Sequence, residues 1–116
     1  MRPTTVTIYD QDGTDVVVQA FTTAAPGLVV HVSNGDPGWV VTHERSGLLV
    51  MMFENPEQAQ AAAGDLALLA DWTLDGHAIM CTPHIELKVA SVRSKWGGET
   101  WLMNDNPDAY ADRLSA

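Results

Sequence analysis

The chain has 116 residues, of which 46% are hydrophobic and 18% are charged, and it contains four tryptophans. This length and composition allow one hydrophobic core that offsets the entropy lost on folding, so we predict a single domain over residues 1–116 and exclude intrinsic disorder. Fifteen acidic residues against six basic ones give a net charge of −9. Such a charge repels phosphate groups and argues against direct binding to nucleic acid or to anionic lipid.

Cysteine content and hydropathy indicate a compartment. The single cysteine, Cys81, cannot form an intrachain disulfide, and the first ten residues lack the apolar core of a secretory signal. The longest strongly apolar run, Leu48–Phe53, is far shorter than the roughly 20 residues that span a bilayer. We therefore expect a cytoplasmic protein that makes no membrane contact.

The first half of the sequence has the pattern of β-strands. Alternating or β-branched segments predict five of them, at 4–10, 15–21, 27–33, 39–44 and 48–53. Turn signals at Asn34-Gly35 and Asp36-Pro37-Gly38 end the third strand, and Gly47 fits a short hairpin loop between the last two. His31, which alternates with valines, is expected on the solvated face of its strand.

From residue 55 the hydrophobic period changes to between three and four. Asn55 is a predicted N-cap and Pro56 a predicted first helical residue. The apolar stripe that follows indicates a helix packed on the sheet, and its members are Ala59, Ala62, Ala63, Leu66, Leu69 and Ala70.

A second helix is predicted with Thr82 as its cap, Pro83 at its first position and Gly97 as its stop. Its apolar stripe consists of Ile85, Val89, Val92 and Trp96. A strand is the competing interpretation, because Ile85, Leu87 and Val89 also recur at period two. A short strand at 99–103 and a terminal helix at 106–116 complete the pattern.

These elements predict an α+β domain, in which two or three helices pack on one face of an antiparallel sheet of five or six strands. An unpaired edge of such a sheet also allows a homodimer.

His77, Cys81 and His84 form a nominal metal-ligand set, since their spacing would bring them together on one continuous helix. Pro83 interrupts such a helix, and neither paired cysteines nor a His-x(3–5)-His unit is present. The site therefore requires a loop that gathers all three side chains despite Pro83. We predict no metal and no cofactor, and we interpret this segment as a connection between two helices.

No catalytic motif stands out. Cys81 lies among apolar residues without a nucleophile signature, which is typical of a small buried hydrophobe. Asp10, Asp12 and Asp15 depart from the calcium-loop pattern, and the glycine-containing turns lack the remaining residues of a phosphate loop.

Two surfaces are candidates for contact with a partner. On the second predicted helix, His84, Lys88, Ser91 and Lys95 form a stripe at helical spacing, although such a stripe is also typical of a merely solvated face. The other candidate is the hairpin tip, formed by His43, Glu44 and Arg45, where charged residues would also keep a loop soluble. The acidic residues Asp105, Asp108 and Asp112 form a third charged group.

The segment Trp39–Thr73 contains "WVVTHERSGLLV", in which a tryptophan is followed by threonine-histidine and by serine-glycine-leucine. An alanine-rich predicted helix and "LADWT" come after it. With these features the segment resembles small uncharacterised proteins of actinobacteria and their phages. The resemblance covers about a third of the chain and implies an accessory protein that acts by binding a host protein. It implies no catalytic residue.

The leading hypothesis is a small acidic, non-enzymatic protein-binding module, with His43, Glu44, Arg45, His84, Lys88 and Lys95 as contact residues. The first alternative is an acidic mimic of nucleic acid that occupies a DNA- or RNA-binding protein. The second is a small metal-dependent or thiol enzyme.

Overall fold

The computed structural model describes residues 1–9, 14–33 and 37–100. Its elements, in chain order, are β1 Pro3–Tyr9, β2 Asp15–Thr22, β3 Leu28–Val32, β4 Trp39–His43, β5 Leu48–Phe53, α1 Pro56–Leu66, α2 Gly76–Met80, α3 Ile85–Trp96 and β6 Glu99–Thr100. The six strands form one antiparallel sheet in the order β1-β2-β3-β4-β5-β6, so each strand pairs with its neighbour in sequence.

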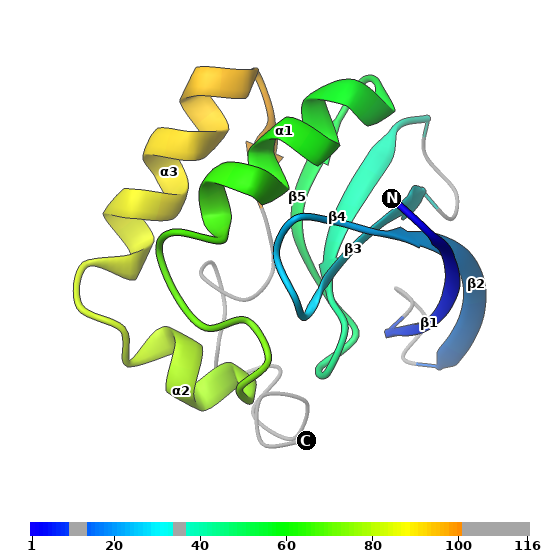
Figure 1. The fold of residues 1–116 in the computed structure, drawn as a ribbon, viewed down its shortest axis with the longest axis horizontal. Coiled ribbons are helices and arrows are strands. Elements are labelled where there is room, and N and C mark those ends of the chain that lie inside the picture. The colour runs from blue at the N-terminus through cyan, green and yellow to red at the C-terminus, as the bar shows by residue number, and fades with distance from the viewer. Residues whose placement is uncertain (10–13, 34–36, 101–116) are drawn as a thin grey trace.

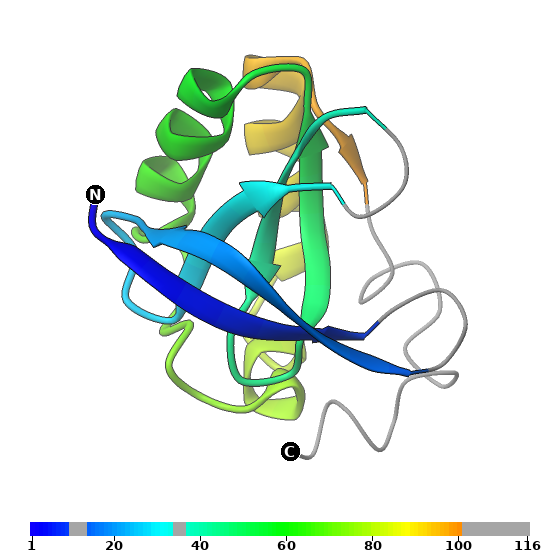
Figure 2. The ribbon, with the colours of Figure 1, turned by 90° about the vertical axis from the view of Figure 1, so that its right-hand side faces the viewer.

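The helices pack on one face of this sheet (Figures 1 and 2). α1 contacts β3, β4 and β5, and α3 lies beside α1. Alanines on α1, among them Ala59 and Ala63, are fully buried against the strands, and their small side chains allow close approach of the helix. The predicted α+β class, with helices on one face of an antiparallel sheet, is confirmed.

A bulge in β5 enlarges the core contributed by that strand. Met51 pairs with Val41 and Leu49 pairs with Thr42, which leaves Val50 as the extra residue. An extra residue breaks the strict alternation of the two faces. As a result both Val50 and Met51 are buried.

The ribbon formed by β1 and β2 crosses the face of the sheet opposite the helices (Figure 2). β2 pairs with β3 only at Phe21↔Val30 and Thr22↔Val29, after which the ribbon leaves the β3 ladder. Val6, Ile8 and Ala20 of the ribbon form a small second core with Val29 of β3.

The expectation that His31 faces solvent is wrong. The residue is buried, and its ring bonds to the carbonyl of Val32 at 2.8 Å and to Thr42 Oγ1 at 2.7 Å. It shares a strand face with Val29, which the ribbon covers.

α1 begins as predicted and ends early. Asn55 Oδ1 accepts a hydrogen bond from the Gln58 N–H at 2.9 Å, and Pro56 is the first helical residue. The helix ends at Leu66, so the last part of its predicted apolar stripe lies in a loop. The indole N–H of Trp72 donates to the Leu66 carbonyl at 2.8 Å and thereby satisfies one carbonyl at the end of the helix.

α3 is a helix, and the strand interpretation of this segment is wrong, since Leu87 is 73% exposed where a sheet would bury it with Val89. Its start differs from the prediction. The cap position is His84, with a left-handed backbone at φ 60°, rather than Thr82. The preceding connection contains the short helix α2, capped by Asp75 Oδ1 on the Ala78 N–H at 2.8 Å.

The predicted strand at 99–103 is present as β6 up to Thr100. The rest of it and the predicted helix at 106–116 lie outside the described residues, as do Asp10, Asp12, Asp105, Asp108 and Asp112. None of the helices in the described part of the chain is long and apolar enough to cross a membrane.

Candidate functional site

The tip of the β4–β5 hairpin is hydrogen-bonded to the loop that connects α1 to α2. His43 is 0% exposed, so its prediction as a surface contact residue is wrong. Its Nε2–H donates to the carbonyls of Trp72 and Leu74, each at 3.0 Å, and Arg45 Nη1 donates to the carbonyl between them, that of Thr73, at 3.3 Å. Three consecutive carbonyls of the loop are therefore bonded to the hairpin.

The neighbours of His43 define its tautomer. Carbonyls only accept, so Nε2 carries the proton and Nδ1 accepts from the Ser46 hydroxyl at 2.7 Å. The Ser46 oxygen in turn accepts from the Leu48 N–H at 3.2 Å. Burial lowers the pKa of His43, and the two carbonyl bonds offset part of that effect.

This serine–histidine pair is built as a structural link rather than as a nucleophile and its base. Ser46 is buried, and its oxygen is already engaged by the β5 backbone. A substrate therefore has no access to the hydroxyl in this arrangement.

A glycine lets a second segment reach the same loop. Gly27, in the turn between β2 and β3, has φ +93°, and a Cβ built there would lie 2.2 Å from the carbonyl oxygen of Trp72. Only glycine permits both this backbone conformation and this approach. The turn and the loop are thus in direct backbone contact.

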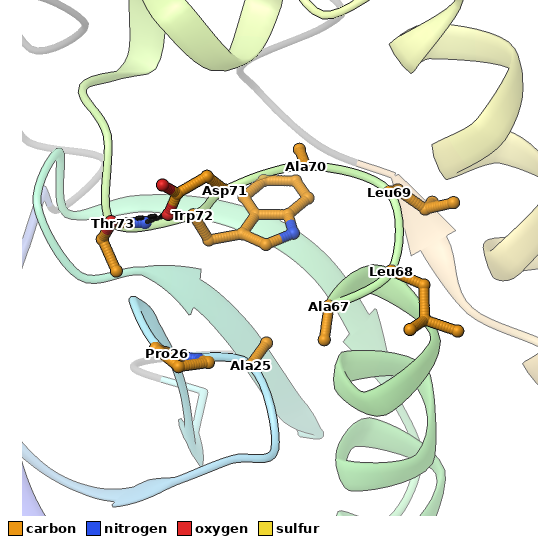
Figure 3. A pocket seen from close by; sticks show the side chains of 9 residues that line it. All are labelled: Ala25, Pro26, Ala67, Leu68, Leu69, Ala70, Asp71, Trp72 and Thr73. Carbon is orange, nitrogen blue, oxygen red and sulfur yellow. Dashed lines mark hydrogen bonds between the residues drawn. The ribbon is translucent and has the colours of Figure 1, made fainter.

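Where the turn and the loop meet they enclose a surface groove of about 510 Å³ (Figure 3). One side is formed by Ala25 and Pro26, and the other by residues 67–73, with the Trp72 indole between them. Most of the lining is aliphatic or aromatic. We call this feature the 67–73 groove.

One side chain at the groove is conspicuously exposed. Leu68, at the end of α1, is 86% exposed, more than any other large hydrophobic residue in the described part of the chain. The polar lining residues are Asp71 and Thr73, and Asp71 Oδ1 accepts from both the Thr73 N–H and the Thr73 hydroxyl, at 3.1 and 2.5 Å. These hydrogen bonds, led by the hydroxyl, lower the pKa of Asp71.

A smaller hollow of about 230 Å³ lies beyond the end of α3. It is lined by Pro37, Met52, Phe53, Glu54, Gly97 and Glu99. None of the residues that line it is a leucine exposed like Leu68, and two of them are glutamates, so the 67–73 groove is the better candidate site.

The remaining predicted contact residues are at the surface. Glu44 and Arg45 are exposed at the hairpin tip, while His84, Lys88 and Lys95 are exposed along α3. Lys95 Nζ is paired with Asp65 Oδ2 of α1 at 2.9 Å and lies 5.2 Å from the centre of the Trp96 ring. The bond from the Trp96 indole and then that from Lys95 lower the pKa of Asp65. Lys95 therefore contributes to the α1–α3 contact.

The structure does not bring together the nominal ligand set of His77, Cys81 and His84. All three residues are exposed, and no three His, Cys, Asp or Glu side chains in the described ranges gather as metal ligands. His77 lies in α2, whereas His84 follows the Thr82-Pro83 turn. The expectation that Cys81 is a buried hydrophobe is also wrong.

Sequence reasoning missed the groove because α1 stops without a stop signal. Residues 67–70 contain neither glycine nor proline and continue the apolar period, so the sequence predicts that the helix continues through them. The sequence does contain one informative feature, a tryptophan just beyond this run, at position 72.

Comparisons of this chain with protein-family models, with curated proteins and with solved structures found no match.

Proposed function

We propose that this chain is a non-enzymatic protein-binding module and that its docking site is the 67–73 groove. The observation that carries the proposal is Leu68, 86% exposed beside a hollow of about 510 Å³ whose lining residues are mostly aliphatic or aromatic. Exposed apolar side chains that gather at a concave surface are typical of interaction sites.

The way in which the loop is held supports this function. His43 and Arg45 bond its backbone, and the buried Trp72 indole anchors it to the end of α1. These contacts use the backbone and the indole and leave Leu68 facing solvent. A preorganised loop loses little conformational entropy on binding, which favours docking of a partner.

The occupant we propose is a protein segment with an aliphatic or aromatic anchor and an adjacent lysine or arginine. Apolar residues line most of the groove, and at its polar end Asp71 is exposed and keeps its negative charge. The chain as a whole carries −9, which also favours a basic partner. In view of the resemblance of Trp39–Thr73, the partner is sought in the host cell of a phage or mobile element.

Two exposed leucines allow a matched test. Leu68→Asp introduces a charge at the groove, and Leu87→Asp introduces the same charge on α3, within the face that carries Lys88. The wild type and both variants are used to capture proteins from a lysate of the source cells, with nuclease present. We expect a stoichiometric partner with the wild type and with Leu87→Asp, and its loss with Leu68→Asp.

The same comparison separates the alternatives. Loss of the partner with Leu87→Asp alone would move the site to the α3 stripe and contradict the groove. Capture of DNA- or RNA-binding proteins that is abolished at about 0.5 M salt would instead support nucleic-acid mimicry, because salt screens exposed charges at this concentration.

A further inference from the structure

The outer edge of β1 forms no ladder with another strand in the described part of the chain, although β1 also lies close to β5. The sheet order begins at β1, and among residues 1–9, 14–33 and 37–100 the one strand paired with it is β2, along Pro3↔Phe21 to Tyr9↔Asp15. Figure 2 shows β1 in dark blue, twisted together with β2 in the ribbon. An edge of seven residues that is neither paired nor charged is a template for strand addition.

The hydrogen bonds indicate which residues of β1 face outward. The Thr22 N–H donates to the Arg2 carbonyl at 2.9 Å, so residues 2 and 22 form a hydrogen-bonded pair of the β1–β2 ladder. Such pairs recur every second residue in an antiparallel ladder. The backbone groups of Val6 therefore point to β2, and those of Thr5 and Thr7 point to the open edge.

The composition of β1 suits a second copy of itself. The segment PTTVTIY contains no charged residue, although the chain carries −9, so two copies meet here with little local repulsion. Residues 4–8 of this strand are all threonine, valine or isoleucine, and such β-branched residues favour strand pairing. Pro3 lacks an N–H, so in a symmetric pair of β1 strands it limits the hydrogen bonding at each end of the interface and leaves the central residues unaffected.

Charge at the two ends favours the antiparallel arrangement. Arg2 precedes β1, while Asp15 of β2 stands opposite Tyr9 at the other end. Antiparallel pairing of two copies brings the Arg2 end of each to the Asp15 end of the other. A two-fold axis at Val6 places Thr5 opposite Thr7 of the second copy, and cross-strand threonine pairs are favourable.

We propose that β1 pairs antiparallel with β1 of a second copy about a two-fold axis at Val6, which makes the chain a homodimer with one sheet continuous across both copies. The interface is formed by the backbone groups of Thr5 and Thr7. It is separate from the 67–73 groove and independent of the function proposed for that groove.

The test uses charge pairs that are specific to this register. In Thr5→Lys/Thr7→Lys, each lysine lies opposite a lysine of the second copy. We expect light scattering on the full chain to show a concentration-dependent doubling of mass for the wild type, and a dissociation constant about tenfold higher for this variant.

The matched control places the same charges one strand inward. Val17 and Gln19 are the β2 partners of Thr7 and Thr5 and share their exposed face, so Val17→Lys/Gln19→Lys adds equal charge away from the edge. This control is expected to dimerise like the wild type. Melting curves of both variants verify that they are folded.

A mixture of two variants with opposite charges at positions 5 and 7 tests the proposed register. Thr5→Lys/Thr7→Lys mixed with Thr5→Glu/Thr7→Glu should form a heterodimer at concentrations where each alone is monomeric. A wild type that stays monomeric at millimolar concentration, or that pairs only with a foreign peptide strand, overturns the proposal. The proposal is also overturned if the mixture of the lysine and glutamate variants does not associate. A dimer that Leu68→Asp abolishes would overturn it as well, because that result would place the interface at the 67–73 groove.

Discussion

His43 forms three hydrogen bonds at a position without solvent exposure, and they join the β4–β5 hairpin to the loop that forms one side of the groove. Its ring also packs edge-on against Trp72, with 6.3 Å between ring centres. Two loop carbonyls and one serine hydroxyl depend on this side chain. The sequence predicts that His43 contacts a partner. In the structure His43 is instead buried, and its hydrogen bonds hold the loop of the candidate site.

Replacement of His43 therefore destabilises the fold. His43→Ala leaves the Trp72 and Leu74 carbonyls without their donor and opens a cavity, which should lower the free energy of unfolding by about 3 kcal/mol. Urea unfolding measures the change. His77→Ala, at an exposed position, is the control and should stay within about 0.5 kcal/mol of the wild type. A small effect of His43→Ala would show that the loop is held by other contacts.

Acidification should destabilise the protein through both buried histidines. Burial lowers the pKa of His31 and of His43 below the ordinary value of 6.5. The unfolded chain then binds protons that the native chain does not, so stability is complete above about pH 6.5 and falls as the pH drops toward the folded pKa values. The slope is at most about 1.4 kcal/mol per pH unit for each histidine.

Melting temperatures between pH 5.0 and 7.5 measure this dependence. His31→Asn/His43→Asn removes both titrating groups and should flatten the curve in this window, even though the variant is less stable. An equal slope in the variant would assign the pH dependence to other groups.

At the scale of elements, the site depends on how closely backbones approach. The turn between β2 and β3 contacts the loop through Gly27, whereas Gly64, within α1, has no neighbouring atom within 4 Å of a built Cβ. The two glycines therefore respond oppositely to an added methyl group. At Gly27 a positive φ and a backbone contact require glycine, whereas Gly64 occupies a helix position at which alanine is more favourable.

Gly27→Ala should cost more than about 2 kcal/mol, because the new Cβ overlaps the Trp72 carbonyl and the backbone is strained. Gly64→Ala should add about 0.5–1 kcal/mol of stability. Chemical denaturation of the two variants beside the wild type measures both changes. Equal effects of the two substitutions would contradict the close approach at Gly27.

At the scale of the whole molecule, the sheet is divided between two cores. The strands from β3 to β5 and the helices share the large core, and the ribbon of β1 and β2 has its own cluster around Val6 and Ile8. Only two residue pairs join β2 to β3. We therefore expect the ribbon to open while the large core stays folded.

Native-state hydrogen exchange should detect this division. Amides of β1 and of the first half of β2 should exchange faster than those of β4. Ile8→Ala should accelerate exchange in the ribbon alone, while Val41→Ala, in the large core, should accelerate it throughout. Uniform protection across the sheet would show that the molecule opens as one unit.

Strand composition and turn chemistry sufficed to predict β1 to β5. β1 alternates valine and isoleucine with threonine, whereas β3, β4 and β5 are nearly continuous runs of apolar and β-branched residues bounded by turn signals such as Gly47. Local capping chemistry sufficed at Asn55-Pro56 for the start of α1. The same local argument was wrong at Thr82-Pro83, because the short helix α2 and a left-handed His84 precede α3.

Local sequence patterns by themselves determined the α+β class, the hairpins β1–β2 and β4–β5, and the amphipathic helices, since these depend on hydrophobic period and on residues adjacent in sequence, whereas the order of the strands in the sheet came from the structure. The tertiary structure alone decided that His43 and His31 are buried, that α1 ends at Leu66, and that a groove opens beside Leu68. The physical reason is distance along the chain. Gly27, His43 and Trp72 meet through backbone contacts and hydrogen bonds between segments about 16 to 45 residues apart, which no local pattern encodes.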